Sequence, residues 1–224
     1  MTRRVFLFEM LLIAAALAAT AVLYPHMPAR VPTHWNFRFH PDGYSSKLAL
    51  FWIGPGLMAG VMLLTWILPW LSPKKFEIES FRSTYGLAML ITFGIVAYIN
   101  VFLLWAAVDS PINAGKAICG GVCVFVALFG NLLGKVRRNF YLGVRTPWTL
   151  ANERVWYATH RFAAKTFVAA GLLGLLLSVI GLYLWAMFSL LAGGLVPAVY
   201  SLVYYKQLER SGELGEEITR EPGR

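Results

Sequence analysis

The sequence predicts an all-α, polytopic membrane protein with six transmembrane helices, and three observations support this prediction. The chain of 224 residues is 58% apolar and only 14% charged, whereas an average soluble domain carries about 25% charged residues. Its apolar residues gather in runs of the roughly 20 residues that a helix needs to cross a hydrocarbon core. The basic residues behind the net charge of +9 lie in the connections between these runs. There they orient a membrane protein and do not form a nucleic-acid-binding patch, so we expect no direct nucleic-acid binding.

Hydropathy windows place the six predicted spans at Val5–Leu23, Leu48–Leu71, Gly86–Val108, Ala117–Leu133, Thr166–Tyr183 and Ala186–Tyr205. The first span follows Arg3 and Arg4 and imitates a secretory signal. We expect it to stay uncleaved, because its apolar stretch is longer than a signal core and no polar cleavage region follows directly. The last two spans are nearly fused. As one helix they would reach about 58 Å, so we expect a tight turn near Tyr183–Met187.

The distribution of basic residues predicts that both termini lie in the cytoplasm. With the N-terminus inside, the outer segments hold only four of the 20 lysines and arginines, and the inner segments hold the remaining 16. The four outer residues are Arg30, Arg38, Lys47 and Lys116.

We expect three parts in the chain. Residues 1–71 form an N-terminal two-helix unit with an extracytoplasmic loop at 24–46, and residues 72–205 form a four-helix region with a cytoplasmic loop at 130–165. Residues 206–224 form a charged cytoplasmic tail that is predicted to be disordered. Both loops are longer than the usual connection of about 4–6 residues, so function is expected in them.

The outer loop is predicted to form a compact cap over the outer helix ends. Pro25, Pro28 and Pro32 hold its backbone extended, and Pro41-Asp42-Gly43 is a turn signal. Its candidate ligand-binding residues are His34, Trp35, Asn36, Asp42 and Lys47. Histidine and aspartate are metal ligands, but their spacing here matches no metal motif. We therefore predict no metal and no cofactor, and expect His34 and Asp42 to hydrogen-bond the loop backbone.

The inner loop is predicted to end in a short amphipathic helix that runs into the fifth span. Thr146 is its expected N-cap with Pro147 at the first helical position, and Thr149 is a competing N-cap. At helical spacing, Thr149, Glu153, Trp156, Tyr157 and His160 share one face. The loop is interpreted either as an interfacial motif that fixes the helix, with Arg137, Arg138 and Arg145 as partners for Glu153, or as a docking or catalytic site. The candidate docking residues are Asn131, Asn139, Arg145, Thr146, Pro147, Trp148, Thr149, Glu153, Trp156, Thr159 and His160.

A few polar residues lie inside the predicted spans. Glu9 and Asn100 are functional candidates, because ionisable and polar groups are costly in a membrane. Cys119 and Cys123 share a helix face, but two thiols do not complete a metal site, and we interpret them as small packing residues.

Together the two loops resemble the SdpI family, in which many chains open with a domain of unknown function that carries a P-x-H-W-N and P-D-G pattern. The outer match consists of Pro32-Thr33-His34-Trp35-Asn36, Pro41-Asp42-Gly43 and Lys47. The inner match consists of Gly130-Asn131, Asn139, Gly143-Val144-Arg145-Thr146-Pro147-Trp148-Thr149-Leu150, Glu153, Val155-Trp156 and Thr159-His160.

The resemblance implies a multi-pass protein of the bacterial plasma (inner) membrane that confers immunity to a membrane-acting Sdp-type peptide toxin. It implies as partners the lipid bilayer, the peptide toxin and a cytoplasmic ArsR-type repressor that the protein sequesters to transmit a signal. We expect no enzyme. The alternative is a membrane-embedded hydrolase that uses Glu153 and His160, or His34 and Asp42, in metal or acid–base chemistry. No H-E-x-x-H or G-x-S-x-G motif supports that alternative.

Overall fold

The computed structural model describes residues 3–73, 78–108 and 113–215. Within them, six helical segments are long and apolar enough to cross a membrane, which confirms the prediction of a multi-pass membrane protein. Five of the crossings are single helices, namely α1 (Arg3–Leu23), α4 (Arg82–Ala107), α5 (Ala114–Leu133), α7 (Glu153–Val179) and α8 (Tyr183–Arg210). The second crossing joins α2 (Ala49–Phe51), a π-helical turn (Trp52–Gly56) and α3 (Leu57–Leu71).

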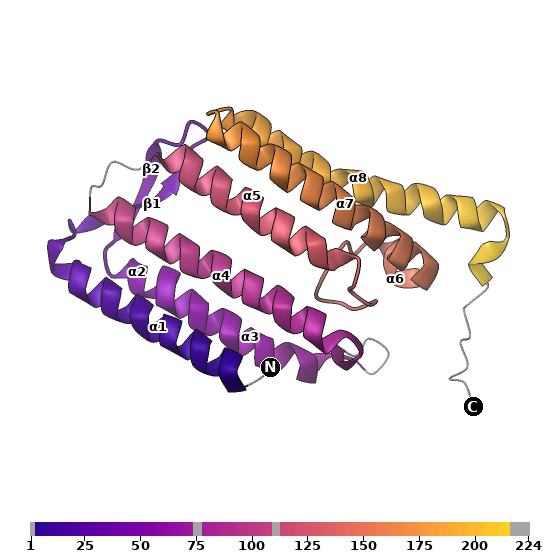
Figure 1. The fold of residues 1–224 in the computed structure, drawn as a ribbon, viewed down its shortest axis with the longest axis horizontal. Coiled ribbons are helices and arrows are strands. Elements are labelled where there is room, and N and C mark those ends of the chain that lie inside the picture. Colours follow the sequence, from indigo (N-terminus) through magenta and orange to yellow (C-terminus); the bar gives the residue numbers. More distant parts are fainter. Residues whose placement is uncertain (1–2, 74–77, 109–112, 216–224) are drawn as a thin grey trace.

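The six crossings run side by side along the long axis of the molecule (Figure 1). Helices α5, α7 and α8 pack closely on one another, and α4 packs against α5 on one side and α3 on the other. The start of α1, the end of α3, the start of α4 and the end of α8 lie at one end of this bundle, which we call the basic end (Figure 1). The opposite end carries a two-stranded sheet and is called the hairpin end (Figure 1).

The π-helical turn in the second crossing contains Pro55 and packs against the buried Asn100 of α4. A Cβ added at Gly54 would lie 1.9 Å from Oδ1 of Asn100, so this close approach requires glycine. The irregular turn is buried against a polar neighbour, which is where a membrane protein tolerates departures from the regular helix.

The turn between the last two crossings lies earlier than predicted. Helix α7 ends at Val179 and α8 begins at Tyr183, so the predicted turn at Tyr183–Met187 is wrong. Gly181 takes a positive φ of 85°, and the N–H of Leu182 donates to Leu177 O at 2.8 Å. This glycine-based helix end is a stronger stop signal than the aromatic residues that follow it.

The C-terminal segment is more ordered than expected. Helix α8 continues to Arg210, and Glu213–Gly215 form a 3-10 turn, so the disorder expected from residue 206 does not begin there. The side chain of Arg154 pairs with Glu213 at 2.9 Å and links this turn to α7. The rest of the predicted tail, residues 216–224, lies outside the described residues.

The outer loop forms a β-hairpin that the sequence analysis did not predict. Strand β1 (Arg30–Trp35) pairs antiparallel with β2 (Pro41–Ser46), so the predicted turn at Pro41–Gly43 is wrong. The turn lies at residues 36–40, where Oδ1 of Asn36 accepts the N–H groups of Arg38 and His40 at 2.8 and 3.1 Å. Pro25 is also not extended, because it lies in the 3-10 turn Tyr24–His26.

The predicted amphipathic helix is broken into two pieces. Thr146 caps α6 (Pro147–Ala151) as expected, but Asn152 then adopts an extended backbone and its side chain caps α7 by accepting Val155 N–H at 3.1 Å. Thr149 and Glu153 therefore belong to different helices and do not share one face. From Glu153 the chain has no further stop signal, so the fifth helix begins well before the predicted Thr166.

The buried side chains form clusters at both ends of the bundle. At the hairpin end, Val31 of β1 packs with Leu50 and Phe102. At the basic end, Trp156 packs with Tyr85 and Leu132. The outward faces of the helices are apolar, and their exposed large apolar side chains extend over several crossings. A surface of this kind fits a lipid environment.

Candidate functional site

Asn139 organises the inner loop from a fully buried position. Its Oδ1 accepts the N–H groups of Tyr141 and Leu142, each at 2.7 Å. Its Nδ2 donates to Arg137 O at 2.7 Å and to Leu142 O at 3.2 Å. One side chain thus satisfies four backbone groups of a segment without regular secondary structure. Asn139 fixes the path of the loop and is not available to a partner.

His160 ties the same loop to α7. Its Nδ1 donates to Trp156 O at 2.8 Å, and its Nε2 accepts the N–H of Val144 at 3.0 Å. A carbonyl only accepts and a backbone N–H only donates, so the ring is neutral with its proton on Nδ1. The ring stacks on Trp156 with centroids 3.9 Å apart and is 1% exposed. Both ring nitrogens are occupied, which leaves none for acid–base chemistry.

Trp156 and Gly143 complete the surroundings of His160. We call this packed region, which joins the inner loop to α7 and α8, the inner joint. Nε1 of Trp156 donates to Val136 O at 2.8 Å, which holds the end of α5 against α7. Gly143 has a φ of 106°, and a Cβ at this position would lie 2.1 Å from Nε2 of His160. The glycine is required both for its backbone conformation and for the approach of the ring.

A second group of polar side chains joins α6 to the middle of α8. Thr146 and Thr149 form a reciprocal capping box, and Oγ1 of Thr149 also donates to Val144 O at 2.9 Å. The hydroxyl of Ser201 lies 3.1 Å from that of Thr146 and accepts a hydrogen bond from Nε1 of Trp148. These threonines and the tryptophan are satisfied within the protein.

The remaining predicted docking residues differ in how far their side chains are exposed. Asn131, Arg145, Pro147 and Glu153 are exposed at the basic end. Arg145 donates to Phe140 O, and Glu153 interacts with Tyr157 one turn along α7. Thr159 is fully buried, and its hydroxyl has no hydrogen-bond partner among the described residues. Most of the candidate docking residues are thus packed within the protein, and only a few are exposed. Any docking role for them remains a prediction.

The outer hairpin presents a polar pair on its open face. Nδ1 of His34 donates to Oδ1 of Asp42 at 2.6 Å, with the two side chains 72% and 43% exposed. The structure therefore brings together two of the predicted ligand-binding residues. They bond to each other across the strands, and not to the loop backbone as expected.

The other outer candidates anchor the hairpin to the bundle. Trp35 packs on Phe102 of α4 with ring centroids 4.9 Å apart. Nζ of Lys47 donates to Tyr24 O at 3.0 Å and to Met27 O at 3.3 Å, and lies 4.4 Å from the centre of the Tyr24 ring. Asn36 closes the turn. These three residues position the hairpin, and His34 and Asp42 are displayed on it.

The hairpin tip holds aromatic residues that the sequence analysis missed. Phe37 is 93% exposed. Phe39 packs on the ring of Tyr183 at 5.1 Å, and the Tyr183 hydroxyl donates to Oδ1 of Asn113 at 2.9 Å. The tip of an N-terminal loop thus contacts Tyr183 at the start of α8, and Tyr183 in turn bonds to Asn113, which caps α5. The aromatic residues were visible in the sequence, but nothing there distinguished the exposed Phe37 from the packed Phe39.

Glu9 is 1% exposed in α1, and its Oε2 has no hydrogen-bond partner within the described residues. Asn100 is likewise buried, at the π-helical turn. In the part of the chain that the structure describes, no three side chains of the His, Cys, Asp and Glu types gather closely enough to hold a metal ion. Cys119 and Cys123 are free and fully buried.

Two segments of the chain match models of known families, and most of its length is similar to a known protein. Residues 135–205 match the model of the SdpI/YfhL protein family, and residues 11–59 match a domain of unknown function, DUF1648. The chain is 26% identical over 208 residues to "Immunity protein SdpI" of Bacillus subtilis (strain 168), across 92% of this chain and 98% of that protein. No solved structure matches.

These findings confirm the predicted resemblance, and the relative is named for immunity and not for a catalytic activity. The first match contains the inner joint, including Asn139, His160 and Ser201, and the second contains the whole hairpin. The expected boundaries at residues 71 and 205 stay predictions.

Proposed function

From the match of residues 135–205 to the SdpI/YfhL family model, we propose that the protein is a membrane immunity protein that protects its cell from a peptide toxin. The observation that carries the proposal is the extent of the similarity. It covers 98% of an immunity protein, so both the hairpin end and the inner joint have counterparts in that relative. The proposal places the protein in the bacterial plasma membrane with both termini in the cytoplasm.

Within this proposal, the hairpin is the surface that meets the toxin. It displays Phe37 and the His34–Asp42 pair, which offer an apolar contact and a polar one at the hairpin end. Exposed aromatic side chains are frequent anchors in protein interfaces. The Lys47 bonds and the Trp35–Phe102 contact hold this surface in place, so it meets a ligand with little further ordering.

The inner joint serves as the scaffold in this proposal. Its histidine, asparagine and threonines use their polar atoms internally, which supports a structural role for them. The exposed Arg145, Glu153, Arg161 and Lys165 are left to meet a cytoplasmic partner of the ArsR repressor type. A tagged repressor of that type should move to the membrane only when the protein and the toxin are both present, and an unchanged distribution contradicts this part.

Protection can be tested directly in toxin-sensitive bacteria. Cells that express this chain should survive an Sdp-type peptide at concentrations that kill cells with an empty vector, and Bacillus subtilis SdpI serves as the positive control. Phe37→Ser and Asp42→Asn should reduce protection at equal protein levels. Glu209→Gln, which breaks an exposed ion pair of 2.6 Å with Lys206 on α8, is the matched control and should protect normally. Cells that die as fast as the vector control while SdpI protects would refute the proposal for this toxin.

A further inference from the structure

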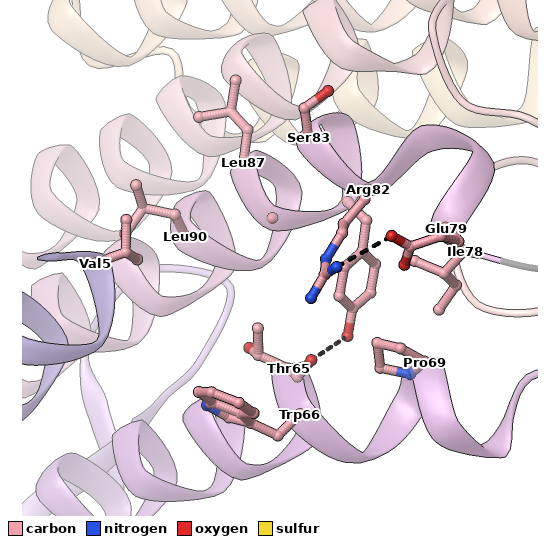
Figure 2. Close-up of a pocket in the computed structure, with 12 residues that line it drawn as sticks. Val5, Thr65, Trp66, Pro69, Ile78, Glu79, Arg82, Ser83, Leu87 and Leu90 are labelled. Atoms are coloured by element: carbon pink, nitrogen blue, oxygen red, sulfur yellow. Dashed lines mark hydrogen bonds and ion pairs between the residues drawn. The ribbon is translucent and has the colours of Figure 1, made fainter. Parts of the chain in front are cut away.

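A cavity with a volume of about 690 Å³ lies between α1, α3 and α4 at the basic end. Figure 2 shows its walls, with Val5 of α1 on one side, Trp66 and Pro69 of α3 below, and Leu87 and Leu90 of α4 above. The volume is within the range of small-molecule sites, which is about 300–1,000 Å³. This cavity is distant from the hairpin and takes no part in the function proposed above.

The polar groups of Thr65 and Tyr85 in the cavity wall are used within the protein. Pro69 has no N–H, so the carbonyl of Thr65 four residues earlier lacks its helical donor. The Tyr85 hydroxyl supplies that hydrogen bond at 3.0 Å (Figure 2). The Thr65 hydroxyl in turn donates to Val61 O at 2.8 Å. The inner part of the cavity therefore offers an occupant mainly apolar surface, which suits a hydrocarbon chain.

One edge of the cavity is charged. Arg82 begins α4 and pairs with Glu79 at 3.0 Å, and these side chains are 63% and 68% exposed (Figure 2). An exposed pair of this kind is weak and exchanges readily. A guanidinium has five N–H donors, so Arg82 can keep this contact and still donate to a second anion.

The surroundings of this edge are basic. Arg3 and Arg4 are exposed in the first turn of α1, directly before Val5 in the cavity wall. Helices α1 and α4 both begin at the basic end of the bundle (Figure 1). Arg3 and Arg4 therefore lie at the same end of the molecule as Arg82, next to the α1 side of the cavity. Basic residues at the end of an apolar groove between membrane helices match the layout of a lipid, whose phosphate lies at the surface above its chains.

We propose that this cavity binds one anionic phospholipid of the surrounding bilayer. The acyl chain lies between Trp66 and Leu87, and the phosphate receives hydrogen bonds from Arg82. The net positive charge at this edge selects an anionic headgroup over a zwitterionic one. The bound lipid fills the space between the N-terminal helix and the α3–α4 pair and so joins α1 to the rest of the bundle.

Gly86 gives a steric test of the cavity. It lies in the cavity wall, and a Cβ there would meet no atom of the described residues within 4 Å. Gly86→Leu should therefore fill the cavity without disturbing the fold. Gly194→Leu in α8 is the matched control, because a Cβ at Gly194 also meets no described atom within that distance. Arg82→Gln tests the headgroup contact separately.

The measurement is native mass spectrometry of the full-length protein titrated with phosphatidylglycerol or phosphatidylcholine. The wild type and Gly194→Leu should retain phosphatidylglycerol preferentially, Arg82→Gln should weaken that binding about fivefold, and Gly86→Leu should abolish it. Equal retention of the two lipids by the wild type would overturn the anionic specificity. Unchanged binding to Gly86→Leu would overturn the site itself. Thermal unfolding in detergent confirms that each variant is folded before it is titrated.

Discussion

The backbone N–H of Val144 donates a hydrogen bond of 3.0 Å to Nε2 of His160, sixteen residues further along the chain. This contact holds the inner loop on the start of α7, and the stacking of His160 on Trp156 holds the ring in turn. His160, a candidate docking or catalytic residue by sequence, is thus buried and links the inner loop to α7. These contacts give His160 and Trp156 a structural role at the basic end of the bundle.

Gly143 is the position at which a substitution most directly disturbs the inner joint. Gly143→Ala should lower the free energy of unfolding by more than about 2 kcal/mol, because alanine is strained at positive φ and its Cβ would collide with Nε2 of His160. Thermal unfolding in detergent, followed by tryptophan fluorescence, measures the change. Gly134→Ala is the matched control. Gly134 has φ −64° and ψ −14°, and its added Cβ meets only Ala164 at 3.8 Å, so stability should stay equal or rise. Equal losses in the two variants would contradict the joint.

His160→Phe separates a structural role from a functional one. The ring and its stacking are kept, but the N–H of Val144 loses its acceptor, which should cost about 1–3 kcal/mol of stability. Protection from toxin, divided by the amount of protein in the membrane, should stay at the wild-type value. A full loss of protection at normal protein levels and normal stability would show that His160 acts in function.

The hydrogen bond from Tyr85 to the carbonyl that Pro69 leaves free predicts a coupling between these residues. Tyr85→Phe alone should destabilise the protein by about 1 kcal/mol, because Thr65 O loses its donor. In a Pro69→Ala background the alanine N–H can bond to that carbonyl, so the same substitution should cost less. A double-mutant cycle of unfolding free energies measures this difference, and additive costs would rule the coupling out.

Lys47 should control how firmly the hairpin is docked. Lys47→Met keeps the length of the side chain but removes both hydrogen bonds to the segment that follows α1, at Tyr24 and Met27, and the cation over the Tyr24 ring. Backbone amides of residues 30–46 should then exchange with deuterium roughly tenfold faster, which corresponds to about 1.4 kcal/mol of local stability. Lys116→Met, at an exposed position, is the control. Unchanged exchange in the hairpin would show that Lys47 is not its anchor.

The helical scaffold was largely predictable, because apolar runs of membrane length depend on local composition. The boundaries were less so. The turn at Gly181 had a local glycine signal, but the aromatic residues after it suggested a later position. The helix break at Asn152 was missed because Asn152 is a second capping residue that follows shortly after Thr146. The hairpin escaped prediction because its strands do not alternate cleanly between apolar and polar residues. It is stabilised by tertiary contacts, such as Trp35 on Phe102.

The motifs singled out residues, but not how those residues are arranged. They named His34 and Asp42, which the structure brings into contact, and His160 and Thr146, which it ties into internal hydrogen bonds. Whether these residues form functional sites stays a prediction. Their partners could not be deduced, because the contacts bring together distant parts of the chain. Ser201 lies 55 residues from Thr146, and no local pattern announces that the two hydroxyls meet. Exposure also depends on the assembled bundle, which is why Phe37 was missed.

The most direct test of toxin binding at the hairpin is site-specific photo-crosslinking in living cells. A photoreactive phenylalanine analogue is placed at Phe37 on the hairpin tip, or at Phe140 in the inner loop, where the native side chain is 39% exposed. The cells are then irradiated with a tagged Sdp-type peptide present. We predict a crosslinked adduct from the Phe37 position, none from the Phe140 position, and competition by untagged peptide. A protein that protects its cells but crosslinks only through Phe140, or through neither position, would contradict binding at the hairpin.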